Sequence, residues 1–177
     1  GGEAEIYGLE FEGQAALTED WTAGLSVAWA PSEYKTFEAN FVVPYGVPAD
    51  VSGNSINRYP EWTGSITSTY TTAINNTWDG FVRGDVVYFG KTFPEVDNLA
   101  YCDSYITANA RIGIEKDNLR IEAFVKNAFD DSSYTACQRF SDFDGIPLEF
   151  SVLTRYQGVQ VTPQVPRQFG VRTSLNF

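Results

Sequence analysis

The chain has 177 residues, of which 43% are hydrophobic and 15% aromatic, and its formal net charge at pH 7 is −11. The length suffices for one domain with a sizeable core, and the acidic balance excludes a nucleic-acid-binding protein, which needs a basic surface. No run of eighteen apolar residues is present, which excludes a transmembrane helix but not a transmembrane β-barrel, whose strands alternate.

Seven stretches alternate apolar and polar residues with a period of two, the pattern of a β-strand with one apolar face. In chain order they are residues 6–17, 21–30, 62–72, 78–90, 106–115, 119–126 and 167–177. The fifth is the clearest, with five apolar residues on one face. The fourth is the least regular, because Phe81, Val87 and Phe89 fall on the face that carries its charged residues.

The connections between these strands alternate in length. Short turns follow the first, third and fifth strands, and long irregular segments follow the others, at about 31–60, 91–104 and 130–166. Short periplasmic turns and long extracellular loops are typical of outer-membrane barrels. A soluble β-sandwich also has hairpins and loops, but no rule places its long loops at one end. We therefore expect an all-β fold, an antiparallel up-and-down transmembrane β-barrel.

Aromatic residues on the apolar faces fit the two interfaces of a membrane. Trp21 and Trp29 are eight residues apart, or ~27 Å at the usual rise along a strand. On a tilted strand this is close to the separation of the aromatic girdles that bound the hydrocarbon band. We assign to these girdles Trp21, Trp29, Trp62 and Tyr70.

Charged residues lie opposite the apolar rows: Glu10, Glu12, Arg111, Glu115, Arg120, Glu122, Lys126 and Arg172. In a soluble sandwich these residues would form the solvent-exposed face. In a barrel they would line a hydrated lumen, where neighbouring carboxylates and guanidinium groups pair.

Three segments resemble TonB-dependent outer-membrane receptors. Residues 5–12 resemble the strand that opens the last third of these proteins. Residues 126–130 resemble the family's N-L-F-D element, with Ala128 in place of Leu. Residues 165–177 resemble the closing strand, where we assign the assembly signal to Phe169, Val171, Leu175 and Phe177. The resemblance implies that residues 1–177 are about seven C-terminal strands of a 22-stranded barrel.

Seven strands are too few to close such a barrel, and lipid does not tolerate open sheet edges. The chain begins at Gly1 without a signal peptide, and we expect it to be a fragment. The resemblance implies that a missing N-terminal portion or a companion chain supplies the rest of the barrel, the plug and the segment that meets TonB.

The resemblance also implies a function and a location. The receptor would take up a scarce ligand (a ferric siderophore, cobalamin or a glycan) through the bacterial outer membrane, energised by TonB. Lipids and lipopolysaccharide would surround it, with the long loops extracellular and the C-terminus periplasmic. A small passive porin-like barrel and a soluble secreted β-sandwich that binds carbohydrate remain alternative interpretations.

Two sets of loop residues are candidates for a structural or a ligand-binding role. Cys102 and Cys137 lie at the same end, before the fifth strand and after the sixth, and we expect a disulfide between them. Other loop residues would either contact a ligand or pack the loops together: Tyr34, Phe37, Tyr45, Phe93, Phe140, Phe143 and Tyr156. The chain lacks histidine, and nothing singles out a nucleophile. We therefore expect no enzymatic activity, no metal site and no cofactor.

Overall fold

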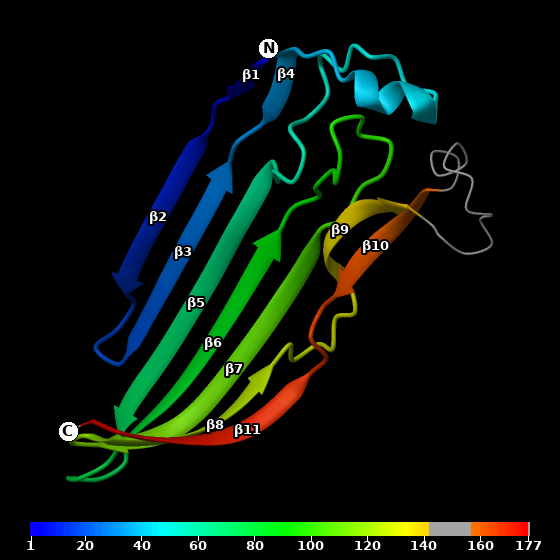
Figure 1. Cartoon of the computed structure of the whole chain (residues 1–177). Helices are drawn as coiled ribbons and strands as arrows, with labels where there is room; N and C mark the ends of the chain where they lie inside the picture. The colour runs from blue at the N-terminus through cyan, green and yellow to red at the C-terminus, as the bar shows by residue number, and fades with distance from the viewer. Residues whose placement is uncertain (142–156, 177) are drawn as a thin grey trace.

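The computed structural model describes residues 1–141 and 157–176 as eleven strands and one short 3-10 helix (Figure 1). Their bounds are β1 (Glu3–Ile6), β2 (Leu9–Ala16), β3 (Trp21–Trp29), β4 (Ser32–Thr36), η1 (Asn40–Tyr45), β5 (Trp62–Ala73), β6 (Asp79–Phe89), β7 (Tyr105–Lys116), β8 (Leu119–Lys126), β9 (Tyr134–Ser141), β10 (Gln157–Pro163) and β11 (Gln168–Leu175). Within these residues no helix is long and apolar enough to cross a membrane.

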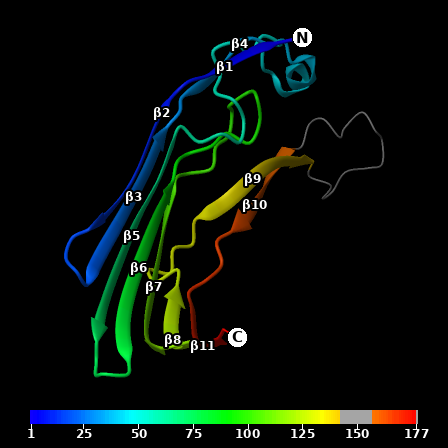
Figure 2. The same cartoon turned by 90° about the vertical axis from the view of Figure 1, so that its left-hand side faces the viewer.

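Seven strands form one antiparallel sheet in the order β11-β8-β7-β6-β5-β3-β2. Each of the seven predicted strands has its counterpart in this sheet, so the predicted up-and-down order is confirmed. Figure 2 shows that the sheet is curved. It is also open, since β2 and β11 each pair with one strand only among the described residues. The C-terminus lies beside the short turns (Figure 1), and Asn118 donates a hydrogen bond to the carbonyl oxygen of Asn176 at 2.7 Å.

Two details of the predicted strands and loops are wrong. The strand predicted over residues 6–17 is interrupted, because β1 leaves the large sheet and pairs with β4. A Cβ at Gly8 would lie 2.2 Å from the carbonyl oxygen of Trp29, so glycine is required where the two chains approach. The long segments are also less irregular than predicted, since they contain β4, η1, β9 and β10.

The register places the apolar rows of all seven strands on one face. Ile66, for example, lies between Leu25 of β3 and Val86 of β6. Ile66, Ile112 and Val171 expose 56, 59 and 74% of their surfaces, and no described element packs on this face. A soluble sandwich would cover such a face with a second sheet. An uncovered apolar face of this extent indicates contact with an apolar environment.

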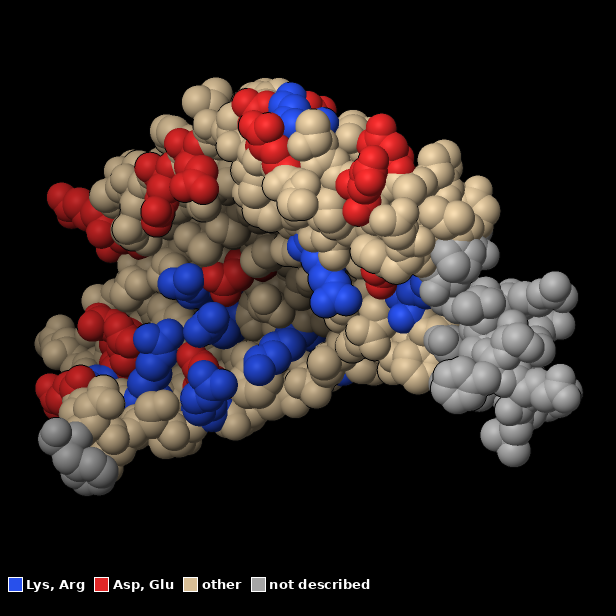
Figure 3. All heavy atoms as spheres, turned by 45° about the horizontal axis from the view of Figure 1, so that its top comes forward, with Lys and Arg blue, Asp and Glu red and all other residues tan. Residues whose placement is uncertain are grey.

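The opposite face of the sheet, the inner face, carries ion pairs. Asp85 receives hydrogen bonds from Arg83 and from Arg111, with N–O distances of 2.9 and 3.2 Å. Glu122 receives hydrogen bonds from Arg120 and Arg172, both at 3.3 Å. Figure 3 shows Lys and Arg side chains gathered along the hollow of the molecule. The predicted pairing of carboxylates with guanidinium groups is therefore confirmed.

Replacement of Glu122 by glutamine is expected to lower the free energy of unfolding by about 1–3 kcal/mol, because two guanidinium groups lose a buried carboxylate. The matched control is Glu115→Gln, since among the described residues Glu115 forms an ion pair with Arg120 alone, and it is 40% exposed, whereas Glu122 is 5% exposed. Urea unfolding of the complete receptor in detergent would measure both variants. Equal losses in the two would contradict the prediction.

The inner face also explains the irregular alternation of β6. Phe81 points inward, is only 4% exposed, and has the guanidinium of Arg120 at 3.8 Å from its ring centroid. Its ring lies beside Gly113 of β7, where an added Cβ would meet ring atoms at 2.7 Å. Phe124 lies beside Gly170 of β11 in the same way. Each aromatic ring fills the space that the glycine of the neighbouring strand leaves.

Gly113→Ala is expected to lower the free energy of unfolding by about 1–3 kcal/mol through overpacking. The new methyl group would also lie 2.4 Å from the carbonyl oxygen of Ile121. Gly84→Ala is the control, because nothing lies within 4 Å of a Cβ at that position. Unfolding by denaturant would measure the difference, and a Gly113→Ala variant as stable as Gly84→Ala would refute the packing argument.

Candidate functional site

The long connections at one end of the sheet pack into one body, which we call the cap: residues 31–61, 90–104, 127–141 and 157–167. Its first two segments are joined by reciprocal hydrogen bonds. The amide of Asn98 accepts from the backbone N–H of Ser55 at 2.8 Å and donates to its carbonyl oxygen at 3.1 Å. Asn54 donates to the carbonyl oxygen of Val96 at 2.8 Å. The first two connections are therefore held in a fixed arrangement.

The cap has a small apolar core of its own. Its buried members are Ala39, Val42, Val51 and Val96. Val42 belongs to η1, and Tyr34 and Phe37 pack against this cluster with their ring centroids 5.0 Å apart. The core joins residues from two connections, so burial of apolar surface adds to the hydrogen bonds between them.

The third connection of the cap, residues 127–141 and 157–167, is attached to the second by a disulfide and an ion pair. Cys102 and Cys137 are bonded, which confirms the predicted disulfide. Arg139 of β9 pairs with Asp97, whose side chain is 1% exposed. The β9–β10 hairpin is thereby tied to residues 90–104.

The Asn-Ala-Phe-Asp segment explains how the chain turns from the barrel wall into the cap. Asn127 is 4% exposed and has a left-handed backbone with φ 47°. Its side-chain amide donates to the carbonyl oxygens of Asp131 and Val165, at 2.8 and 3.0 Å. Asp130 accepts a hydrogen bond from the backbone N–H of Arg167 at 2.8 Å. The segment therefore fixes the approach to β11.

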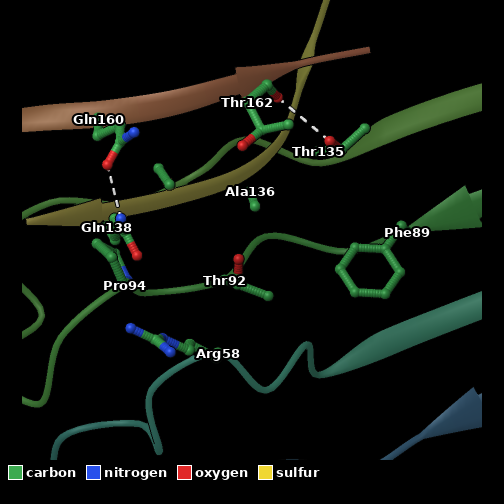
Figure 4. A pocket seen from close by; sticks show the side chains of 10 residues that line it. Arg58, Phe89, Thr92, Pro94, Thr135, Ala136, Gln138, Gln160 and Thr162 are labelled. Carbon is green, nitrogen blue, oxygen red and sulfur yellow. Dashed lines mark hydrogen bonds between the residues drawn. The ribbon is translucent and has the colours of Figure 1, made fainter. Parts of the chain in front are cut away.

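A cavity of about 310 Å³ lies among the three parts of the cap (Figure 4). Its lining residues are Arg58, Phe89, Thr92, Pro94, Thr135, Ala136, Cys137, Gln138, Gln160 and Thr162. Phe89 belongs to the inner row of β6, since it pairs with Thr63 and Tyr105. The cavity therefore lies on the same side as the inner face, where a molecule entering a barrel would pass.

Hydrogen bonds order the β9–β10 wall of this cavity. Gln138 donates to the side-chain oxygen of Gln160 at 2.7 Å, and Thr135 donates to the carbonyl oxygen of Thr162 at 3.2 Å. Among the described residues the lining contains one charged side chain, Arg58, and no carboxylate. Among the described residues no group of His, Cys, Asp and Glu could hold a metal ion.

Two groups of the cap have shifted pKa values, both away from the cavity. Hydrogen bonds to Glu33 and Glu5 raise the pKa of Lys35 above its ordinary value, and this lysine joins β1 to β4. The hydroxyl of Ser52, followed by its backbone N–H, donates to Asp50 and lowers the pKa of that carboxyl.

The residues predicted for the membrane girdles form two cross-strand pairs on the apolar face. Trp29 is opposite Trp62 at the end near the cap, with ring centroids 6.0 Å apart. Trp21 is opposite Tyr70 at the short-turn end. The indole N–H groups of Trp29 and Trp21 donate to side chains on β5 or just before it, Glu61 and Ser68. Contact with membrane interfaces remains a prediction.

Those predicted loop aromatics whose side chains are described do not line the cavity, with the exception of none but Phe89, which was not among them. Tyr34 and Phe37 pack on the cap core, and Phe93 lies 4.9 Å from the ammonium group of Lys91. Phe140 lies on β9 and is half-exposed. The side chain of Tyr45 and residues Phe143 and Tyr156 lie outside the described residues.

The residues of the proposed assembly signal follow β11. Phe169, Val171 and Leu175 lie on its apolar face and are exposed, while Phe177 lies outside the described residues. Their role in assembly stays a prediction.

Sequence reasoning missed the polar residues of the cavity, among them Arg58, Gln138 and Gln160. They lie in three segments that the sequence shows only as irregular connections. The one available signal was Cys137, because a disulfide to Cys102 brings β9 over residues 90–104.

Comparisons with known proteins identify the family. The model of the TonB dependent receptor-like β-barrel matches residues 1–128, and the chain belongs to the TonB-dependent receptor family. No curated protein sequence matches the chain significantly.

Two crystal structures share the fold. The ferric yersiniabactin uptake receptor FyuA from Yersinia pestis matches 99% of this chain with a TM-score of 0.74 and 17% identity. The siderophore receptor PiuA from Acinetobacter baumannii matches 97% with a TM-score of 0.67 and 18% identity. The chain covers 24% and 22% of these two proteins. These matches confirm the predicted barrel fold.

Proposed function

We propose that the chain forms part of the wall and the extracellular loops of an outer-membrane receptor for TonB-energised uptake of a scarce ligand. The ligand would be a ferric siderophore, cobalamin or a glycan. The observation that carries the proposal is the apolar face, which stays uncovered across seven strands while the inner face is charged. This arrangement suits a wall between lipid and a hydrated lumen.

The open sheet further supports a larger assembly. The unpaired edges of β2 and β11 would pair with other strands of the barrel, because lipid offers them no hydrogen-bond partner. Residues 1–177 would be its C-terminal part. An N-terminal plug would occupy the lumen and carry the contact with TonB.

The two ends of the sheet suggest its orientation. The cap would be extracellular, the short turns and the C-terminus periplasmic, and the apolar face in contact with lipid and lipopolysaccharide. The Trp29–Trp62 and Trp21–Tyr70 pairs would then lie at the two interfaces of the bilayer.

Uptake by bacteria with and without TonB tests the proposal. Cells producing the complete receptor would be given labelled ferric siderophores, cobalamin and glycans in turn. One of these ligands is expected to accumulate, and its accumulation should stop when TonB is removed. Accumulation that persists without TonB would instead indicate a passive porin-like barrel.

A further inference from the structure

Arg58 differs from every other arginine that the structure describes. Six of the seven described arginines make an ion pair, namely Arg83, Arg111, Arg120, Arg139, Arg167 and Arg172. Arg58 makes none with any described residue, although the chain has 23 acidic and 12 basic residues. Arg58 is exposed, so its guanidinium is hydrated and open to an anion that enters the cavity.

Uncharged polar side chains line the cavity around Arg58, among them Thr92, Gln138 and Gln160. In the described part of the chain no carboxylate lines this cavity, and Asp97, three residues after the lining residue Pro94, is paired with Arg139. The hydroxyl of Thr92 and the side-chain nitrogen of Gln160 make no hydrogen bond with a described residue. Figure 4 shows Arg58, Thr92 and Gln138 around the same opening. The guanidinium of Arg58 and the hydroxyl of Thr92 are donors that suit the oxygens of an anion, whereas the amide nitrogen of Gln138 is already bonded to Gln160.

The backbone holds Arg58 in this place. Its φ of 61° is left-handed, which is unfavourable for a residue with a Cβ. Its N–H donates to the carbonyl oxygen of Phe93 at 2.7 Å, a bond between two connections of the cap. The side chain of Arg58 is therefore attached to a backbone that this hydrogen bond holds in place.

We propose that Arg58 binds a carboxylate group of the transported ligand, and that this ligand is an anionic ferric chelate. The proposal rests on the uptake function proposed above and narrows its ligand class. A cavity of about 310 Å³ is at the small end for ligand sites, so it would receive one arm of the chelate. A neutral glycan fits less well, because Phe89 is the one aromatic side chain among the described residues of the lining.

Equilibrium binding of two radiolabelled iron complexes to the complete receptor in outer-membrane vesicles tests this. Ferric citrate carries carboxylates and a negative charge, and a ferric trihydroxamate without carboxylates serves as the comparison. The unchanged receptor is expected to bind ferric citrate more tightly. Arg58→Gln should weaken that binding about 10- to 100-fold through loss of a charge-assisted hydrogen bond. The affinity of Arg58→Lys for ferric citrate should lie between those of the unchanged receptor and Arg58→Gln, since lysine keeps the charge but lacks the planar pair of donors.

Arg167→Gln is the matched control. Arg167 is an exposed arginine at the same end of the sheet, paired with Asp130 at 3.9 Å and absent from the cavity lining. Its loss is expected to leave the affinity unchanged. Heat-modified electrophoretic mobility would show that each variant contains a folded barrel.

The outcomes separate this proposal from the uptake function. Equal affinity of Arg58→Gln and the unchanged receptor for ferric citrate, or no binding of ferric citrate, overturns the carboxylate site. TonB-dependent accumulation of the trihydroxamate complex in that case would leave the uptake function standing. If no ligand class accumulates in a TonB-dependent way, the uptake function falls as well.

Discussion

Replacement of both Cys102 and Cys137 by serine is expected to lower the free energy needed to open the cap by about 3–4 kcal/mol. The disulfide closes a loop with a sequence separation of 35, and loss of such a link restores the chain entropy of the open state. Protease cleavage of the folded receptor would measure this. Cleavage within residues 127–167 should become faster by on the order of 10²-fold.

Reduction of the unchanged receptor provides an independent control for that variant. Its mass should rise by two hydrogen atoms, and its cleavage rate should approach that of the double serine variant. Cleavage in the wall of the sheet should stay unchanged, because the disulfide joins two connections and no strand of the seven-stranded sheet. Equal cleavage rates of the cap with and without the disulfide would contradict the prediction and show that the apolar core and the hydrogen bonds are enough to keep the cap closed.

The barrel wall could be predicted from the sequence because its structure repeats locally. A period of two decides which face each side chain occupies, and neighbouring strands must align their apolar rows. Ile66, Leu25 and Val86 therefore lie side by side in the register, as the alternation within each strand requires. Even the irregular β6 follows this rule, since Phe81 turns inward over Gly113.

The cap could not be predicted in the same way, because its contacts join residues far apart in the chain. No periodic pattern indicates that the side chain of Asn98 will bind the backbone of Ser55, or that Arg58 will approach β9. The break between β1 and β2 was missed for a related reason. Alternation continues through Tyr7 and Gly8, while the close approach of Trp29 becomes visible only in three dimensions.

The charged residues of the wall and those of the cap are paired differently. On the inner face of the wall, carboxylates are shared between arginines, as Glu122 is between Arg120 and Arg172. In the cap, Asp97 and Arg139 neutralise one another, and Arg58 keeps its charge without a described partner. An anion that enters from the cap end would therefore meet first a guanidinium without a described partner, and then partly neutralised ones further along the inner face.

Ile66→Arg is expected to lower the free energy of unfolding by about 2–4 kcal/mol, the cost of arginine on the lipid face near the bilayer midplane. Ile66 lies midway between Trp62 and Tyr70 on the apolar face and is 56% exposed. In water an exposed isoleucine would tolerate the change with little loss. The prediction therefore distinguishes a lipid-facing surface from a solvent-facing one. Urea unfolding of the complete receptor in lipid vesicles would measure it.

Thr67→Arg is the matched control, on the same strand but with its side chain on the inner face. Thr67 lies between Gly24 and Asp85, so a new guanidinium would reach a hydrated surface with a carboxylate beside it. Its free energy of unfolding should change by less than about 1 kcal/mol. If both arginines are tolerated equally, the apolar face does not meet lipid and the proposed membrane wall is wrong. If only Ile66→Arg lowers the free energy of unfolding strongly, the exposed row that contains Leu25, Ile66 and Val86 is the surface that faces the bilayer.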